Sequence, residues 1–218
     1  MDRYQVLEQI IKTRRSVRKF REEPVPESIV HLLIECARWA PSATNRQPWR
    51  FIAVTRRESV EALERIIAAR IEAIADQAVA GGQQDAALKL KAFGHYATFF
   101  KNAPLVIVCV AEPYRSRFTR EIFEPLKLAQ EAWQLENVKS VCFAVQNLLL
   151  AAHALGYGAC PMSLPGILAG EELKKYLGLK AAEEIVMVVP VGLPEGVPAA
   201  PGRKEVLEIL SWIRPTKN

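Results

Sequence analysis

The chain has 218 residues, which is enough for one large domain or two small ones with a substantial hydrophobic core. Half of the residues are hydrophobic and 24% are charged, the balance of an ordinary soluble globular protein. The net charge of +5 and the pI of about 9.1 suit an anionic ligand such as a phosphate. This excess is too small to indicate nucleic acid binding by itself.

The spacing of the cysteines argues against a metal site. The cysteines and the N-terminal residues together indicate a reducing compartment. No two cysteines form the C-x-x-C pair of zinc or iron–sulfur sites, so we expect free thiols at Cys36, Cys109, Cys142 and Cys160. The first residues lack the apolar core of a signal peptide, which predicts a cytoplasmic protein. Residues 140–170 are uncharged apart from His153, but internal glycines, prolines and amides favour a buried helix over a membrane span.

Hydrophobic periodicity and turn residues divide the chain into helices and strands. The expected elements are, in chain order, helix 3–13, helix 26–40, strand 49–55, helix 57–79, helix 83–100, strand 104–111, helix 132–155, strand 158–163, helix 170–177, strand 184–191 and helix 203–213. The chain shows no internal repeat, long linker or low-complexity tract. We therefore predict one α+β domain over residues 1–218 with about four strands.

Some elements carry a more specific expectation. The strand 104–111 is continuously apolar, so both of its faces should be covered. The segment 113–130 is polar and mixed, and we expect it to be partly irregular. The second helix should direct these side chains inward: Ile29, Leu32, Leu33 and Cys36.

The first candidate site is a basic cluster directly after the first helix. Residues 14–20 read Arg-Arg-Ser-Val-Arg-Lys-Phe, with four cationic side chains and the hydroxyl of Ser16. The planar fork of donors on an arginine matches the oxygens of a phosphate. Taken alone, this cluster is better explained as a solvated basic turn.

The second candidate site follows the second helix. Residues 40–49 read Ala-Pro-Ser-Ala-Thr-Asn-Arg-Gln-Pro-Trp, with hydroxyls and amides between two prolines. Asn45 and Gln47 each offer a donor and an acceptor, which the edge of a heteroaromatic ring such as a flavin pyrimidine requires. The alternative is an ordinary loop that leads from a helix into a strand.

Together the two clusters are far more specific. The pattern R-R-S-x-R-x-F, then a helix, then A-P-S-x-x-N-x-Q-P-W-x-F resembles the N-terminal signature of the nitroreductase family. The resemblance continues at 104–108, at 156–163 and at 191–194 followed by Arg203, so it covers nearly the whole chain. It implies a nitroreductase-like α+β fold, with a central, mostly antiparallel sheet of about four to five strands surrounded by helices. It also implies an intertwined homodimer with two FMN molecules at its interface.

The resemblance implies roles for the basic residues. Arg14 and Ser16 would meet the phosphate and ribityl end of FMN, and Arg203 would close on the phosphate. Arg18 would lie near N1 and the C2 carbonyl of the flavin, where a fixed cation stabilises the reduced ring. Arg15 matches a motif position that contributes mostly backbone contacts.

The resemblance places two further groups at the flavin. The first would reach the flavin of the other subunit, and consists of Pro41, Ser42, Asn45 and Gln47. Ala43 departs from the family, in which this position often carries a second serine or a similar polar residue. The second group would lie along the flavin ring, and consists of Pro161, Met162, Ser163 and Leu164. One backbone N–H there should point at N5, and since Pro165 cannot donate, Ser163 or Leu164 remains.

The function that the resemblance implies is an NAD(P)H-dependent FMN oxidoreductase. Hydride would pass from NAD(P)H to flavin N5 and then, in a ping-pong sequence, to an electron-poor acceptor such as a nitroaromatic or a quinone. The flavin supplies the chemistry, so we expect no catalytic side chain and no metal. The expected partners are a second copy and a small-molecule acceptor, without nucleic acid or membrane.

Two alternatives stay open at this point. The same FMN signature occurs in specialised members of the superfamily, which include dehalogenases of iodinated tyrosines and an enzyme that fragments FMN itself. An alternative from another class is a basic, non-enzymatic protein that binds nucleic acid through residues 14–21. The basic residues lack interleaved aromatic residues suited to base stacking, apart from Phe20.

Overall fold

The computed structural model describes residues 2–128 and 130–213, without the side chains of residues 130–134. Its strands are β1 (Trp49–Val54), β2 (Leu105–Ala111), β3 (Gly158–Ala159) and β4 (Glu184–Gly192). They form one sheet in the order β1-β2-β4-β3, and each neighbouring pair is antiparallel. This confirms the predicted α+β class with a central antiparallel sheet.

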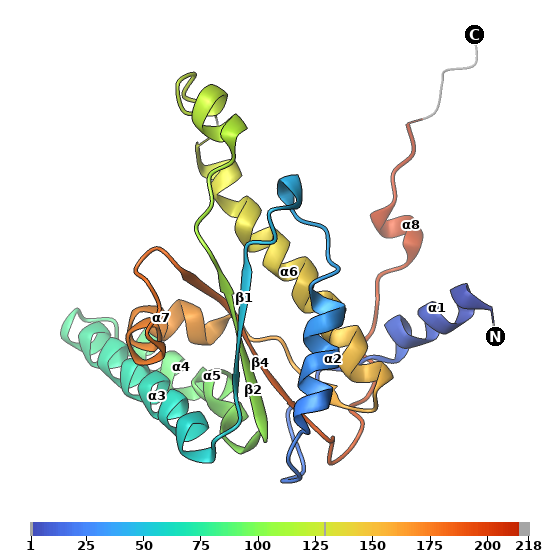
Figure 1. The fold of residues 1–218 in the computed structure, drawn as a ribbon. Coiled ribbons are helices and arrows are strands. Elements are labelled where there is room, and N and C mark those ends of the chain that lie inside the picture. Colours follow the sequence, from blue (N-terminus) through green and yellow to red (C-terminus); the bar gives the residue numbers. More distant parts are fainter. Residues whose placement is uncertain (1, 129, 214–218) are drawn as a thin grey trace.

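Helices cover both faces of the sheet (Figure 1). They are α1 (Arg3–Thr13), α2 (Glu27–Ala37), α3 (Arg57–Ala80), α4 (Gln84–Phe93), α5 (His95–Thr98), α6 (Gln130–Ala154), α7 (Leu164–Leu177) and α8 (Val206–Ile209). Short turns of other helix types occur at η1 (Ala43–Asn45), η2 (Phe99–Asn102) and η3 (Thr119–Phe123). The last of these is a π-helical turn in the segment 113–130, which confirms that this segment is irregular. No helix within the described ranges is long and apolar enough to cross a membrane.

Strand β2 is the centre of the protein, and all of its residues are buried. Because side chains alternate along a strand, β2 contributes to a separate core on each face. Val106, Val108 and Val110 pack with α3, α5 and α7, whereas Leu105, Ile107 and Cys109 pack with α2 and α6. The prediction that both faces of this strand are covered is therefore confirmed.

Four predicted elements differ from the structure. The helix expected at 170–177 begins six residues earlier, because Pro165 suits a first helical turn. The strand expected at 158–163 is correspondingly limited to Gly158–Ala159. The helix expected at 83–100 is divided at Gly94. The helix expected at 203–213 is reduced to α8, whose residues are all exposed, because short helices depend on packing that α8 does not have within one chain.

Two helices bury less of their apolar surface than expected. In α2 the buried residues are Leu33 and Ala37, while Leu32 and Cys36 are exposed, which corrects the predicted inward set. The partly buried Val30 and Ile34 complete the actual face at i, i+3, i+4 and i+7 spacing. Helix α1 contains no buried residue, although Leu7 and Ile11 lie on it.

Candidate functional site

The first cluster is fixed to the sheet by backbone contacts at both of its ends. Ser16 forms a parallel bridge with Ala159, and the Val17 N–H donates to the Ala159 carbonyl at 3.1 Å. Phe20 forms an antiparallel bridge with Pro194, just beyond the end of β4. Residues 16–20 therefore form a short cross-link between β3 and the segment after β4, which holds their backbone in place.

A basic cavity of about 260 Å³ lies beside this cross-link. Its wall contains four arginines and one serine hydroxyl, and its lining residues include no carboxylate: Arg14, Arg15, Ser16, Arg18, Pro198, Ala199, Pro201 and Arg203. The structure thus gathers five residues of the predicted site around one space. A concave surface of one charge sign attracts a ligand of the opposite sign, here an anion.

Arg14 carries the clearest sign of a missing partner in this cavity. Its Nη1 atom is buried and has no hydrogen-bond acceptor within the described part of the chain. A buried guanidinium N–H without an acceptor is costly, so native structures almost always supply one. An anionic ligand in the basic cavity would remove this cost.

The other arginines of the basic cavity are already engaged to different extents. Arg15 Nη1 donates to the carbonyls of Lys12 and Arg14 at 2.7 and 2.8 Å, so its side chain caps the end of α1. The Arg18 guanidinium lies over the Phe99 ring, 5.9 Å from its centroid. Arg203 is exposed and its one hydrogen bond among the described residues goes to the neighbouring Gly202 carbonyl at 3.0 Å.

A second cavity of about 380 Å³ adjoins the first. The two share Ser16, Arg18 and Pro198, and the second adds Lys19 and Glu195 to its wall. The basic cavity therefore continues past Arg18 into a second space whose wall carries both charge signs.

The segment from Cys160 to Leu164 leads away from the basic cavity. Burial raises the pKa of the Cys160 thiol, and the nearby Arg18, the Ser16 hydroxyl and Arg14 oppose this rise. The buried Met162 exchanges backbone hydrogen bonds with Val188, at 3.0 and 2.8 Å. Its N–H is therefore not free to meet a ligand, and neither Pro161 nor Pro165 has one.

Two backbone donors remain in this segment. Ser163 precedes α7 and Leu164 begins it, so neither N–H has a partner inside the helix. Both residues are exposed. These are the same two donors that the sequence left as alternatives.

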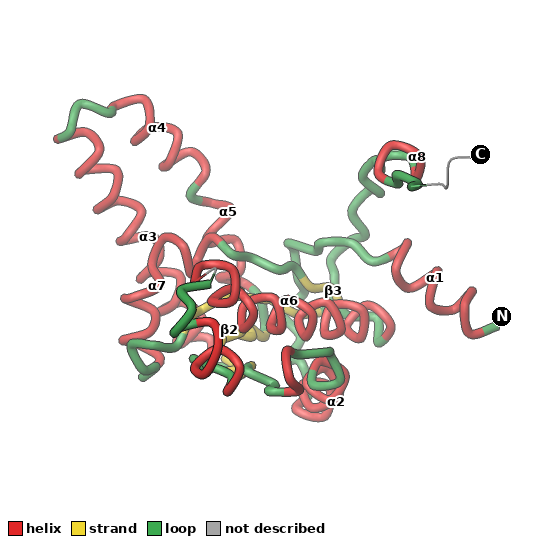
Figure 2. Tube along the Cα trace, turned by 90° about the horizontal axis from the view of Figure 1, so that it is seen from above, coloured by secondary structure: helices red, strands yellow, loops and turns green. Residues whose placement is uncertain are grey.

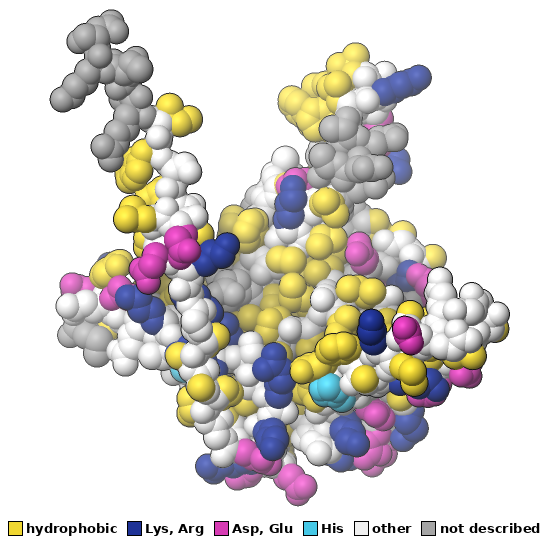
Figure 3. All heavy atoms as spheres, turned by 180° about the vertical axis from the view of Figure 1, so that it is seen from behind, with side chains coloured by type: hydrophobic (Ala, Val, Ile, Leu, Met, Phe, Trp, Pro, Cys, Tyr) yellow, Lys and Arg dark blue, Asp and Glu magenta, His cyan; other side chains and the backbone are white. Residues whose placement is uncertain are grey.

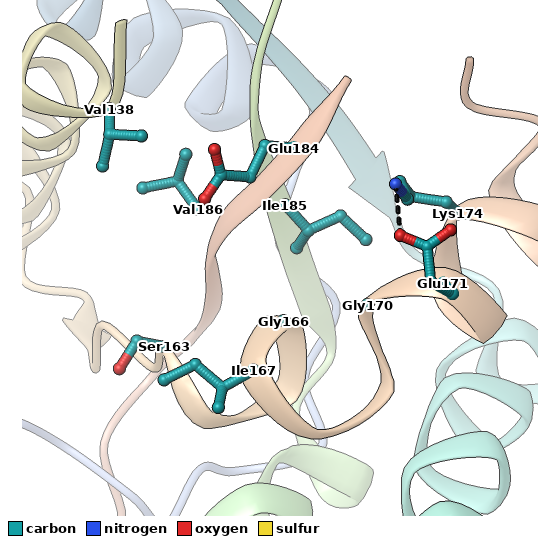
Figure 4. Close-up of a pocket in the computed structure, with 10 residues that line it drawn as sticks. All are labelled: Val138, Ser163, Gly166, Ile167, Gly170, Glu171, Lys174, Glu184, Ile185 and Val186. Atoms are coloured by element: carbon teal, nitrogen blue, oxygen red, sulfur yellow. Dashed lines mark ion pairs between the residues drawn. The ribbon is translucent and has the colours of Figure 1, made fainter. Parts of the chain in front are cut away.

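A third cavity, of about 310 Å³, begins at Ser163 and lies between α7 and β4 (Figure 4). Its cation Lys174 is paired with Glu171 at 2.6 Å and also donates to the Ala181 carbonyl. This cavity therefore lacks the charge match for an anion that the basic cavity offers. Ser163 lies four residues after Ala159, which pairs with Ser16 of the basic cavity, so the start of this cavity and the basic cavity are at most about 13 Å of chain apart.

The second cluster lies elsewhere in the same chain. It follows the end of α2, whereas the first cluster precedes the start of α2, and this helix of 11 residues is roughly 16 Å long (Figure 1). None of the residues lining the basic cavity belongs to the second cluster, which comprises Pro41, Ser42, Asn45 and Gln47. One chain by itself does not bring the two clusters together.

The backbone of the second cluster is strained. Thr44, Asn45 and Gln47 have φ angles of 53°, 51° and 56°, in the left-handed region that few residues other than glycine adopt. The Ser42 hydroxyl accepts the Gln47 N–H at 2.9 Å, and Arg46 lies over the Tyr114 ring at 4.4 Å. Such strain persists only when surrounding contacts hold it, and it is concentrated at functional sites.

Two groups of residues at the basic cavity were not expected from the sequence. Phe99 belongs to a segment that the motifs did not align, and the structure places it against Arg18. The residues Pro198, Ala199 and Pro201 were expected only as loop, and they line the basic cavity. The proline content of 194–201 was the available signal, since proline restricts the chain to a defined path. Among the described residues, no group of three or more His, Cys, Asp or Glu side chains could hold a metal ion.

Comparison with known proteins gives one family. A model of the nitroreductase family matches residues 11–193. A protein of Methanothermobacter thermautotrophicus that carries the name NADH dehydrogenase/NAD(P)H nitroreductase is 30% identical over 149 residues, which are 68% of this chain and 56% of that protein. The chain thus spans little more than half the length of this relative.

Two relatives with other names match over more of their length. Iodotyrosine deiodinase from Thermotoga neapolitana is 28% identical over 93% of this chain and 96% of its own. The 5,6-dimethylbenzimidazole synthase from Rhodospirillum rubrum is 29% identical over 94% of this chain and 88% of its own.

Solved structures share the fold. A BluB-like flavoprotein from Clostridium difficile 630 superposes with a TM-score of 0.82 and 25% identity, over 95% of this chain and 99% of its own. A nitroreductase-type protein from Desulfovibrio desulfuricans, solved in complex with FMN, superposes with a TM-score of 0.67 and 25% identity, over 96% and 98% of the two chains.

Proposed function

The chain belongs to the nitroreductase family of oxidoreductases, and from this premise we propose that it is an FMN-dependent enzyme that transfers hydride from NAD(P)H to an electron-poor small molecule. The observation that carries the proposal is the basic cavity, in which the buried Arg14 Nη1 has no acceptor among the described residues. The FMN complex of the Desulfovibrio protein supports the choice of flavin.

The residues of the basic cavity fit the phosphate of FMN. Arg14, Arg203 and the Ser16 hydroxyl would hold the phosphate, because two guanidinium groups balance a dianion and each can donate two parallel hydrogen bonds. Arg15 would contribute charge only, since its side chain caps α1. Arg18, further along the same wall, would lie at the ring end and stabilise negative charge there.

The segment Pro161–Leu164 would lie along the flavin ring. Ser163 or Leu164 would donate a backbone N–H to the ring atom N5, since Met162 has given its N–H to Val188. Bound FMN supplies hydride transfer at N5, by which NAD(P)H is oxidised and the acceptor is then reduced in a ping-pong sequence. The protein contributes position and electrostatics.

The second cluster would complete the site from a partner copy. Pro41, Ser42, Asn45 and Gln47 lie at the far end of α2 from the first cluster, so their place at a flavin requires a homodimer. Exposed apolar side chains support such a dimer, since Leu7 on α1, Phe143 on α6 and Leu207 on α8 are about half to four-fifths exposed. Hydrophobic side chains gather on the face seen from behind, between the C-terminal arm and the segment 113–128 (Figure 3).

The spectrum of the purified protein is the first test of the proposal. We expect a yellow protein, or one that takes up FMN with a defined stoichiometry, and FMN-dependent oxidation of NADH or NADPH with a nitroaromatic or quinone acceptor. A protein that binds no FMN yet binds DNA with a steep salt dependence would contradict the proposal and favour the nucleic-acid alternative.

A second candidate within the family is a specialised FMN enzyme. It is supported by the matches to iodotyrosine deiodinase and 5,6-dimethylbenzimidazole synthase, which are 28% and 29% identical over 93% and 94% of this chain. Reductive release of iodide from an iodinated tyrosine would support a deiodinase. Oxygen-dependent loss of the flavin spectrum, without an added acceptor, would support fragmentation of FMN.

A further inference from the structure

One side-chain contact ties the end of α1 to the end of α6. Thr13 is the last residue of α1 and His153 lies in the last turn of α6, and their Oγ1 and Nε2 atoms are 2.7 Å apart. In the described part of the chain this is the one hydrogen bond that joins α1 to another helix or strand. Helix α1 buries no residue, and Figure 2 shows it projecting from the body of the protein on the side away from α3 and α4. The contact with His153 therefore holds the last turn of α1 against α6.

The hydrogen-bond partners of Thr13 show which atom donates in this contact. A hydroxyl has a single proton, and the Thr13 hydroxyl donates it to the Gln9 carbonyl at 2.7 Å. The proton between Thr13 and His153 must therefore come from Nε2 of the histidine. Burial lowers the pKa of His153 below its ordinary value of 6.5, and the charges of Arg14 and Arg15 lower it further. At neutral pH the contact is thus made by a neutral ring that carries its proton on Nε2.

Arg14 lies between this contact and a second one. It follows Thr13 directly, and three residues later the Val17 N–H donates to the Ala159 carbonyl at 3.1 Å. Both contacts reach the segment that runs from the end of α6 into β3, so the backbone on either side of Arg14 is held to the same support. A guanidinium binds a phosphate through directed N–H bonds, so its recognition depends on where the backbone places it. The buried Nη1 of Arg14, which has no acceptor among the described residues, is the group placed in this way.

We propose that His153 is a positioning residue for the flavin phosphate: its Nε2–H fixes the end of α1 so that Arg14 presents its buried Nη1 to the phosphate. This rests on the proposed function, because the role of Arg14 at FMN belongs to that proposal. His153 does not line the basic cavity, so it acts through Arg14 and not by contact with the ligand. Loss of His153 should therefore weaken the binding of a flavin that carries a phosphate and spare one that does not.

The first test compares FMN with riboflavin, which has the same ring and ribityl chain but no phosphate. His153→Met removes the Nε2–H donor and keeps a long side chain. We expect the Kd for FMN to rise by about 2- to 12-fold, the range that corresponds to the loss of one hydrogen bond, and the Kd for riboflavin to stay unchanged. His153→Gln keeps an N–H donor at a similar reach and should keep the wild-type Kd for FMN. Titration of flavin fluorescence measures each constant.

The second test approaches the same contact from α1. Thr13 is exposed, and Thr13→Val removes its hydroxyl while it preserves the branched shape and leaves α6 unaltered. We expect the same rise in the Kd for FMN, and no further rise in the double variant Thr13→Val/His153→Met, because both substitutions break one contact. His31→Met is the matched control for the loss of a histidine, since His31 is exposed on α2 and faces Glu27 of its own helix. It should change neither Kd.

The possible outcomes separate this proposal from the proposed function. A wild-type Kd for FMN in both His153→Met and Thr13→Val would overturn the positioning role and leave the proposed function intact. An equal rise in the Kd values for FMN and riboflavin would also overturn it, because His153 would then support the fold as a whole. Failure of His153→Gln to keep the wild-type Kd would exclude the Nε2–H as the group responsible. A wild-type protein that takes up neither flavin would overturn both proposals.

Discussion

Val17 packs so closely on Gly158 that a β-carbon added to Gly158 would stand 2.6 Å from the β-carbon of Val17. Real β-carbons essentially never approach so closely, and the contact lies where residues 16 and 17 bridge to Ala159. The position of the basic cluster thus depends on a glycine far away in sequence. The family pattern in the sequence includes residues 14–20 and 156–163, but it does not show that Val17 packs on Gly158.

Substitution of Gly158 by alanine should displace the basic cluster. We expect Gly158→Ala to lower the free energy of unfolding by about 1–3 kcal/mol, as overpacking does, and to weaken FMN binding. Chemical denaturation and flavin titration measure the two effects. Gly170→Ala is the control, because a β-carbon there would meet nothing within 4 Å. Wild-type flavin affinity in Gly158→Ala would show that the contact does not position the cluster.

The arginines of the basic cavity should differ in their contribution to FMN binding. Arg14→Met removes the buried donor that has no acceptor in the described chain, and a hydrogen bond to a charged group is worth about 1.5–3 kcal/mol. We therefore expect the Kd for FMN to rise by about 10- to 150-fold. Arg15→Met should change this Kd by less than about 3-fold, because its side chain is engaged at the end of α1. Equal effects of the two variants would contradict this division.

The exposed apolar residues near the C-terminus should hold the proposed homodimer together. Leu207 and Trp212 are 83% and 67% exposed within one chain. We expect the double variant Leu207→Ser/Trp212→Ser to dissociate at concentrations at which the wild type is dimeric, because burial of large apolar side chains drives association. Analytical ultracentrifugation gives the masses. Val197→Ser, another 83% exposed position, outside α8, tests whether any exposed apolar residue has the same effect.

Glu183 should make stability fall at acid pH. Its side chain is 4% exposed, and it accepts hydrogen bonds from the Lys180 N–H at 2.6 Å and from Arg50 at 3.0 Å. The Lys180 N–H is the main cause that lowers the pKa of this carboxyl below its ordinary value of 4.5, and Arg50 adds to it. Since the folded state holds the proton less tightly than the unfolded state, the stabilisation is complete above pH 4.5 and is lost as the pH falls through the lower folded value.

Glu183→Gln tests this pH dependence. The variant keeps one acceptor but loses the charge, and we expect it to be about 1–2 kcal/mol less stable at pH 7, with a smaller decline below pH 4.5. Urea denaturation at a series of pH values gives both quantities. Glu184→Gln, at the exposed neighbouring position, should behave as the wild type. If Glu183→Gln declined with acid as steeply as the wild type, another group would be responsible.

Much of the fold follows from local patterns in the sequence. The continuous apolar run of β2 and the long helix-forming run of α3 each depend on residues close together in the chain, so both elements were predicted within one or two residues. The two N-terminal clusters were found for the same reason, since each is a short run with a fixed order of side chains. Elements whose form depends on distant packing, such as α8 and the start of α7, were predicted wrongly.

The sequence by itself therefore determined the family, the antiparallel α+β class and the residues of the basic cluster. Only the tertiary structure decided that Val17 rests on Gly158, that Pro198, Ala199, Pro201 and Arg203 line the basic cavity, and that Phe99 lies against Arg18. It also showed that the two clusters lie at opposite ends of α2. The physical reason is that these relationships join segments up to about 190 residues apart, and local propensity carries no information about contacts formed at that range.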